Sequence, residues 1–147
     1  MVDLIPTLQT AIGPVILISG VALLLLTMTN RLGRAIDRAR LIGATLAEPE
    51  PPARPALEAQ LRILWRRAGL IRSAIALATI SALLAAGLVI ALFFAALLRV
   101  EVAWLITLLF IGCMVSLILA LGLFLHDINQ SLAALRLEMS SHGMDDL

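Results

Sequence analysis

The sequence has little of what soluble domains use most. Only 14% of its 147 residues are charged, it has no lysine, and it has a single cysteine. Soluble domains average about 25% charged and about 45–50% apolar residues, whereas 61% of this chain is hydrophobic. These shortages exclude a disordered chain and a disulfide-bonded scaffold, and they argue strongly against a soluble globular domain.

Long apolar runs predict three membrane spans, at about residues 13–30, 73–98 and 103–125. A helix needs about 17–25 predominantly apolar residues to cross about 30 Å of hydrocarbon. The second and third runs contain no charged residue. We therefore predict an all-α integral membrane protein that forms one domain over residues 1–147.

The residues before the first span allow two interpretations. Apolar residues recur at helical spacing over residues 4–12, which is typical of a short amphipathic segment in the membrane interface. Gly13-Pro14 is then expected to separate this segment from the first span. The alternative is a frayed chain end.

Charge is distributed unevenly along the chain and predicts its orientation. All eleven basic residues are arginine, and nine of them lie between Arg31 and Arg72, where four acidic residues leave a net charge of +5. Basic residues concentrate in the cytoplasmic loops of membrane proteins. We therefore expect this segment in the cytoplasm, the N-terminus outside and the C-terminus inside.

The arginine-rich segment is predicted to form an antiparallel helical hairpin over residues 31–72. Four of the residues from 49 to 55 are proline, and proline is excluded from helix interiors. Apolar residues repeat at intervals of three and four on both sides of this break. The alternative is a loose linker. A similar stripe predicts a cytoplasmic helix over residues 126–139 that continues the third span and packs on the hairpin.

Small residues recur along the spans and predict helix-packing faces. Lipid provides no hydrophobic force between helices, so close contact through small side chains drives their association. These faces fit packing within one three-helix monomer, or between copies, and we favour a homo-oligomer. The candidate packing residues are Ser19, Gly20, Ala74, Ala78, Ala82, Ala86, Gly112, Ser116 and Ala120.

Sequence signatures of catalysis are missing. The chain has no metalloprotease, hydrolase or nucleotide-binding motif, and His126-Asp127 has no other histidine or cysteine near it in the sequence. The spans contain no ionisable residue apart from the Cys113 thiol, which argues against proton-coupled transport. We expect no enzymatic activity, no cofactor and no metal ion. Nucleic-acid binding is not expected either, because the arginines lie against a membrane.

An Asn-Arg motif begins where the first span ends, and it has two interpretations. Arginines at a membrane interface anchor a helix and contact the headgroups of anionic lipids. In an assembled oligomer, the same arginines would form a ring that attracts anions to a pore. The candidate residues are Asn30, Arg31, Arg34, Asp37, Arg38 and Arg40, with Arg66 and Arg67 before the second span.

The layout resembles a bacterial membrane-protein family of unknown function (domain of unknown function, number twenty-seven twenty-one). The matching features are a Pro-x-x-x-Ile-Ser stretch, a leucine-rich span, an Asn-Arg-x-x-Arg-x-x-Asp-Arg-x-Arg motif and a later Arg-Arg pair. The resemblance covers nearly the whole chain and implies a three-span protein with no established activity. The residues that carry it are Pro14, Ile18, Ser19, Asn30, Arg31, Arg34, Asp37, Arg38, Arg40, Arg66 and Arg67.

Two functions from different classes follow from these features. The first is a pore-forming homo-oligomer, such as an ion channel with an arginine-lined cytoplasmic vestibule. It requires hydroxyl groups of Ser19, Thr27, Ser81 or Ser116 to face a symmetry axis. The second is a non-catalytic membrane scaffold whose basic hairpin binds a protein partner or anionic lipid.

The pore interpretation makes a direct prediction. Charge reversal at Arg34 and Arg38 is expected to change the ion selectivity measured in reconstituted bilayers, because the arginine ring attracts anions. Unchanged selectivity, or no current from the parent protein, would reject the pore. A monomer by native mass in mild detergent would reject it too, since three helices cannot enclose a channel.

Overall fold

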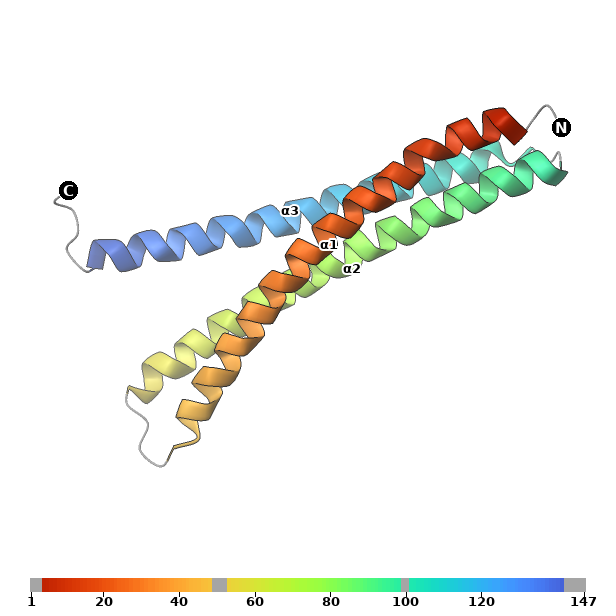
Figure 1. Ribbon diagram of the computed structural model, residues 1–147. Coiled ribbons are helices and arrows are strands. Elements are labelled where there is room, and N and C mark those ends of the chain that lie inside the picture. The colour runs from red at the N-terminus through yellow and green to blue at the C-terminus, as the bar shows by residue number, and fades with distance from the viewer. Residues whose placement is uncertain (1–3, 49–52, 99–100, 142–147) are drawn as a thin grey trace.

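The computed structural model describes residues 4–48, 53–98 and 101–141, with side chains to Leu132. Nearly all of these residues lie in three helices, α1 (Leu4–Leu46), α2 (Arg54–Leu98) and α3 (Ala103–Ser141), and the described residues contain no strand (Figure 1). Each helix is long and apolar enough to cross a membrane. The prediction of an all-α chain with three membrane-spanning helices is therefore confirmed, and the chain has the architecture of a multi-pass membrane protein.

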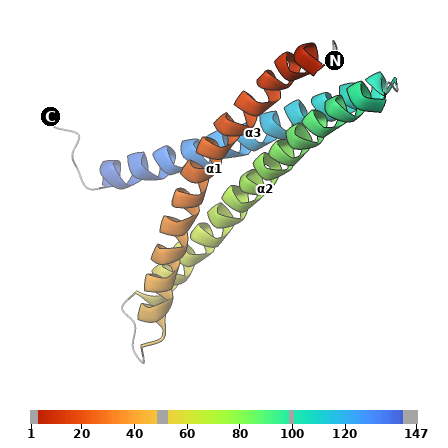
Figure 2. The ribbon, with the colours of Figure 1, turned by 45° about the vertical axis from the view of Figure 1, so that its right-hand side comes forward.

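α2 lies at the centre of the arrangement and packs against both α1 and α3. The three helices run together at the end where α2 meets α3 (Figure 1). Toward the opposite end, α1 and α2 stay side by side whereas α3 diverges from them in both views (Figure 2). We call the diverging part of α1 and α2, residues 32–46 and 54–72, the arm.

The expected contact of residues 126–139 with the predicted hairpin occurs at the start of this segment, where Asp127 and Ser131 meet Arg67, and α3 then diverges from the other two helices (Figure 1). Beyond Asp127, the side chains of Asn129, Gln130 and Leu132 are exposed. Two of these side chains are polar and gain nothing from leaving water. Polar contacts of Asp127 and Ser131 therefore hold the start of this segment, and the exposed side chains beside them do not pack on the arm.

The buried faces of the helices are built from small side chains. Ala74 and Ala78 of α2 and Ala120 of α3 are all 0% exposed. Such residues let helix backbones approach closely, which is what drives helix association in lipid. The buried residues of α2 alternate in spacing between three and four: Ile71, Ala74, Ala78, Ser81, Ala85 and Leu88.

That alternation explains where the predicted alanine ladder of α2 lies. A strict spacing of four advances about 40° around the helix at each step, because a turn holds about 3.6 residues. Ala82 and Ala86 have therefore rotated partly out of the interface and are partly exposed, although Ala82 still packs against the edge of the core. The average spacing of 3.5 keeps one face on the neighbouring helix.

The predicted packing residues on the other two helices lie in different surroundings. On α3, Ser116 and Ala120 are buried, and a Cβ added at Gly112 would lie 3.4 Å from Leu84 Cδ1. On α1, Ser19 and Gly20 are exposed, and no atom lies within 4 Å of a Cβ added at Gly20. The α3 residues thus face the bundle, and the α1 residues face away from it.

Polar side chains join α2 to α3 within the apolar bundle. Ser81 Oγ donates to the carbonyl oxygen of Cys113 (3.0 Å), and Cys113 Sγ lies 3.3 Å from the carbonyl oxygen of Ser81. Ser116 Oγ donates to the carbonyl oxygen of Leu77 at 2.7 Å. Interhelical hydrogen bonds of this kind each contribute about 0.6 kcal/mol in a membrane bundle, so they set helix register more than they set stability.

The N-terminal segment does not separate from the first span as predicted. α1 continues through Gly13 and Pro14 without interruption. Proline removes one backbone hydrogen bond, and membrane helices tolerate this loss. The apolar side chains of Leu4, Leu8 and Ile12 are about half exposed on this continuous helix, where lipid can cover them.

Overpacking the α2 seam tests this packing. Ala78→Leu is expected to lower the free energy of unfolding by about 1–3 kcal/mol, because the larger side chain has no space between the helices. The measurement is an SDS titration of the protein in mixed micelles. Ala76→Leu is the matched control, because Ala76 is exposed on the same helix. Equal effects of the two substitutions would contradict the assigned face.

Candidate functional site

One buried carboxylate connects all three helices. Asp127 of α3 is 0% exposed, and it lies between Arg31 of α1 and Arg67 of α2. Arg67 Nε donates to Asp127 Oδ1 at 3.3 Å. Arg31 Nη1 lies 3.9 Å from Asp127 Oδ2. We call Arg31, Arg67 and Asp127 the charge cluster.

Each arginine of the charge cluster has a second contact on α3. Arg67 Nη2 also donates to Ser131 Oγ, which itself donates to the backbone carbonyl of Asp127 at 3.2 Å. The Arg31 guanidinium lies over the ring of Phe124, 5.5 Å from its centre. A cation over an aromatic face is attracted by the electrons of the ring. Both arginines are therefore held in place by two neighbours.

The electrostatics of the charge cluster make Asp127 dependent on its partners. A buried carboxylate is stable only when cations and hydrogen bonds replace its hydration. Here two guanidinium groups face one carboxylate, so the cluster carries a net charge of +1. Asp127 Oδ2 has no hydrogen-bond partner among the described residues. The ion pair with Arg31 is therefore the contact that offsets the lost hydration of this oxygen. Losing either arginine would leave the carboxylate poorly compensated.

The three charges meet because of their positions on the helices. Arg31 is the first charged residue of α1 after its apolar run, and Asp127 is the first charged residue of α3 after its own. Arg67 lies within the last turns before the charge-free part of α2. When the three helices lie with their apolar runs side by side, the charged residues that flank these runs come together.

The structure places the predicted arginine-motif residues in two groups. Arg31 and Arg67 belong to the charge cluster and are partly buried. The side chains of Asn30, Arg34, Asp37, Arg38, Arg40 and Arg66 are exposed. Among the described residues, the ion pairs involve Asp127, and Asp37 makes none with Arg34 or Arg40. The side chains of six of the eight candidates are therefore available to a binding partner.

Sequence reasoning missed Asp127. It weighed His126 of the His126-Asp127 pair, and the structure places His126 at the exposed surface, 2.9 Å from Gln130 Nε2. One feature of the sequence could have predicted its role. An acidic residue closely follows the third apolar run, and arginines lie at the ends of the other two runs. No group of three His, Cys, Asp or Glu side chains that could hold a metal ion occurs in the described part of the chain.

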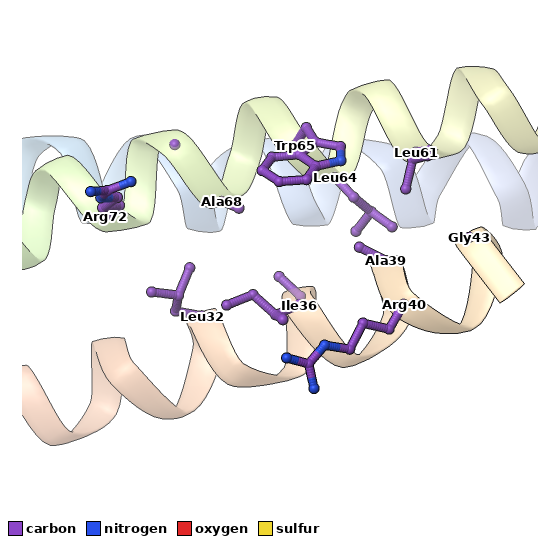
Figure 3. A pocket seen from close by; sticks show the side chains of 12 residues that line it. Leu32, Ile36, Ala39, Arg40, Gly43, Leu61, Leu64, Trp65, Ala68 and Arg72 are labelled. Atoms are coloured by element: carbon purple, nitrogen blue, oxygen red, sulfur yellow. The ribbon is translucent and has the colours of Figure 1, made fainter.

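A groove of about 720 Å³ lies between the two helices of the arm (Figure 3). Its walls are mainly apolar, and two arginines, Arg40 of α1 and Arg72 of α2, also line it. Trp65 lines it too and is 69% exposed. The remaining lining residues, several of them small, are Leu32, Ala35, Ile36, Ala39, Gly43, Leu61, Leu64, Ala68 and Gly69. We call this the arm groove.

Comparison with known proteins places the chain in a family. The family described as "Protein of unknown function (DUF2721)" matches residues 11–137. The chain belongs to this family. No curated protein and no solved structure matches it significantly. The resemblance seen in the sequence is therefore confirmed. The matched residues include most of α1 and α3, all of α2 and the charge cluster of this DUF2721 protein.

Neutralising the buried carboxylate tests the charge cluster. Asp127→Asn is expected to lower the free energy of unfolding by about 3 kcal/mol, because it keeps the volume and leaves two guanidinium groups without an anion. SDS titration of the protein in mixed micelles measures the effect.

Two further variants make this prediction specific. Asp37→Asn removes an exposed, unpaired carboxylate, and it is expected to leave the unfolding midpoint unchanged. The combination Asp127→Asn with Arg67→Gln is expected to cost less than the two single changes added together, because each single change breaks the same contact. Additive losses would show that Asp127 and Arg67 do not interact.

Proposed function

We propose that this DUF2721 protein is a non-catalytic scaffold of a bacterial inner membrane, and that its arm is the binding element. The observation that carries the proposal is the exposed basic surface of the arm. Arg31 and Arg67 are engaged by Asp127, whereas Arg34, Arg38, Arg40 and Arg66 are exposed. Side chains that are not needed by the fold are available to a partner.

The same distribution of charge supports an orientation. The arm carries eight of the eleven arginines and connects the first two apolar segments. Basic connections stay in the cytoplasm, so the arm and the end of α3 extend into the cytoplasm and the N-terminus lies outside. The arm is in this view a cytoplasmic helical hairpin, and the charge cluster lies at the inner membrane surface.

A pore-forming homo-oligomer is the second candidate. It is favoured by one observation, the exposed face of α1 that contains Ser19, Gly20 and Thr27. Small and hydroxyl-bearing residues on an exposed membrane face fit contact with another copy. An anion-selective channel would then be surrounded by Arg34 and Arg38 at its inner mouth.

Hydroxyl groups make the scaffold the better-supported proposal. A polar pore lining needs hydroxyls that are free to face water. Ser81 and Ser116 are buried and donate to backbone carbonyls across the α2–α3 interface. Ser19 and Thr27 donate to carbonyl oxygens of their own helix, those of Val15 and Leu23. Two of the four candidate hydroxyls are therefore buried within the monomer, and the two exposed ones offer water only acceptor lone pairs.

Photo-crosslinking in cells tests the scaffold proposal. A photoreactive amino acid placed at Trp65 or at Arg38 is expected to give discrete adducts with a cytoplasmic protein, because both side chains lie exposed on the arm. The same amino acid at Leu83, exposed on the apolar part of α2, is the control and is expected to give no such adduct. Mass spectrometry of the adducts is the measurement.

The opposite pattern would support the pore instead. Failure of both arm positions to give adducts, together with a reconstituted ion current whose selectivity changes in Arg34→Glu/Arg38→Glu, would overturn the scaffold proposal.

A further inference from the structure

We infer that the arm groove is a docking site for an amphipathic helix of a protein partner that carries acidic residues beside its apolar face. The inference rests on the proposed scaffold function and deepens it by stating the chemistry of the partner. It follows from three properties of the groove: its apolar walls and open floor, its two arginines, and its length.

The floor of the arm groove is open because small residues line it. Ala35, Ala39 and Gly43 lie four residues apart on α1, and Ala68 and Gly69 face the groove from α2. No atom lies within 4 Å of a Cβ added at Gly43 or Gly69. The arm helices therefore leave unfilled a volume of about 720 Å³. Larger side chains of an incoming helix can enter this space.

The walls provide the apolar contacts that such a helix needs. Leu32, Ile36 and Leu64 line the groove, as does the largely exposed Trp65 (Figure 3). Amphipathic helices bind grooves of this kind with apolar residues at positions i, i+3, i+4 and i+7. An exposed tryptophan beside an apolar groove is also typical of the residues that contribute most to binding.

The charge of the lining selects an acidic partner. Arg40 and Arg72 line the groove, and no acidic residue does within the described part of the chain. Neither arginine has an ion-pair partner among the described residues. Each can therefore pair with a carboxylate of the partner without breaking an existing contact. Basic partner helices would be repelled, because like charges brought together cost binding free energy.

The spacing of the two arginines favours a helix over a lipid molecule. Arg72 lies at the Leu32 end of the groove, whereas Arg40 starts nearer the Gly43 end and its side chain runs back along α1 toward Ile36 (Figure 3). Leu32 and Gly43 are eleven residues apart, about 16 Å along α1. The two guanidinium groups come from different helices and lie apart in this view, so they match two acidic residues of a partner helix, whereas a phospholipid presents its charge at one end.

The length of the groove also fits this occupant. About 16 Å accommodates about three helical turns, which is enough for the four apolar anchors. The groove lies beyond Arg31, where the apolar run of α1 has ended. An acyl chain would have to leave the hydrocarbon to fill it.

A fluorescence titration tests the inference on the whole protein. The chain has two tryptophans, so Trp104→Phe leaves Trp65 as the only reporter. The protein is placed in nanodiscs of zwitterionic phospholipid and titrated with an 18-residue peptide of Leu, Ala and Glu, with leucine at i, i+3, i+4 and i+7. We expect a saturable blue shift of Trp65 emission. A matched peptide with lysine in place of glutamate is expected to bind about tenfold more weakly.

Groove variants distinguish specific docking from general adhesion. Gly43→Leu fills the floor and is expected to raise the Kd for the glutamate peptide about tenfold. Gly33→Leu is the matched control, because Gly33 has equal space on the same helix but does not line the groove. Arg40→Glu with Arg72→Glu is expected to reverse the preference toward the lysine peptide.

Four results would overturn the inference. They are no saturable shift with the glutamate peptide, equal affinity for the two peptides, equal effects of Gly43→Leu and Gly33→Leu, and a shift produced by anionic phospholipid or by raised protein concentration without peptide. The last would make a lipid or a second copy the occupant. If any of these results is found while a photoreactive amino acid at Arg38 still gives protein adducts, the groove inference fails and the scaffold proposal stands. The failure of the inference can therefore be distinguished from the failure of the proposed function.

Discussion

The structure depends on one buried carboxylate that two helices compensate from opposite sides. Asp127 has no exposed surface, and the cations that stabilise it come from α1 and α2. Lipid gives helices no hydrophobic reason to associate in one particular register. A buried charge does, because sliding any of the three helices by a turn would separate the carboxylate from a cation. The small-residue seam allows close packing, and the charge cluster fixes where along the helices it occurs.

The cluster also divides the arginines between structure and function. Arg31 is held by Asp127 and Phe124, and Arg67 by Asp127 and Ser131. The arm extends beyond them as two helices with exposed arginines and an apolar groove. A binding surface whose direction is already fixed loses less conformational freedom when a partner docks. In this protein the ion pairs at the base of the arm hold it in one direction relative to the bundle. The contacts that stabilise the fold therefore also position the proposed binding surface.

Much of the fold could be predicted from the sequence. The apolar runs are long enough to identify three membrane helices, and the Asn-Arg motif was specific enough to identify the family. The break at Pro14 was not observed, because a membrane helix tolerates the loss of one hydrogen bond. The predicted ladder of alanines four residues apart, from Ala74 to Ala86, identified two buried positions. Its later members lie partly outside the interface, because the buried residues of α2 follow a 3.5-residue repeat.

The candidate site was less predictable. Arg31 and Arg67 were identified by their positions near the ends of the spans, but their partner was not, since pairing depends on the register of helices far apart in the sequence. Asp127 is separated from Arg67 by 60 residues. The arm groove was not predicted either. A stripe of alanine, glycine and leucine has the same sequence pattern whether two helices pack closely or leave a space between them. Only the three-dimensional arrangement distinguishes the two.

The most direct test of the central claim is a distance measurement between α1 and α3 in a lipid bilayer. Spin labels at Leu41 and Leu125, both exposed, are introduced in a Cys113→Ser background and measured by double electron–electron resonance. With Asp127 present, the account predicts a single narrow distance distribution. Asp127→Ala is predicted to broaden it, because the arm loses its fixed direction. A distribution that is equally narrow without the carboxylate would contradict the claim that this ion pair holds the arm in place.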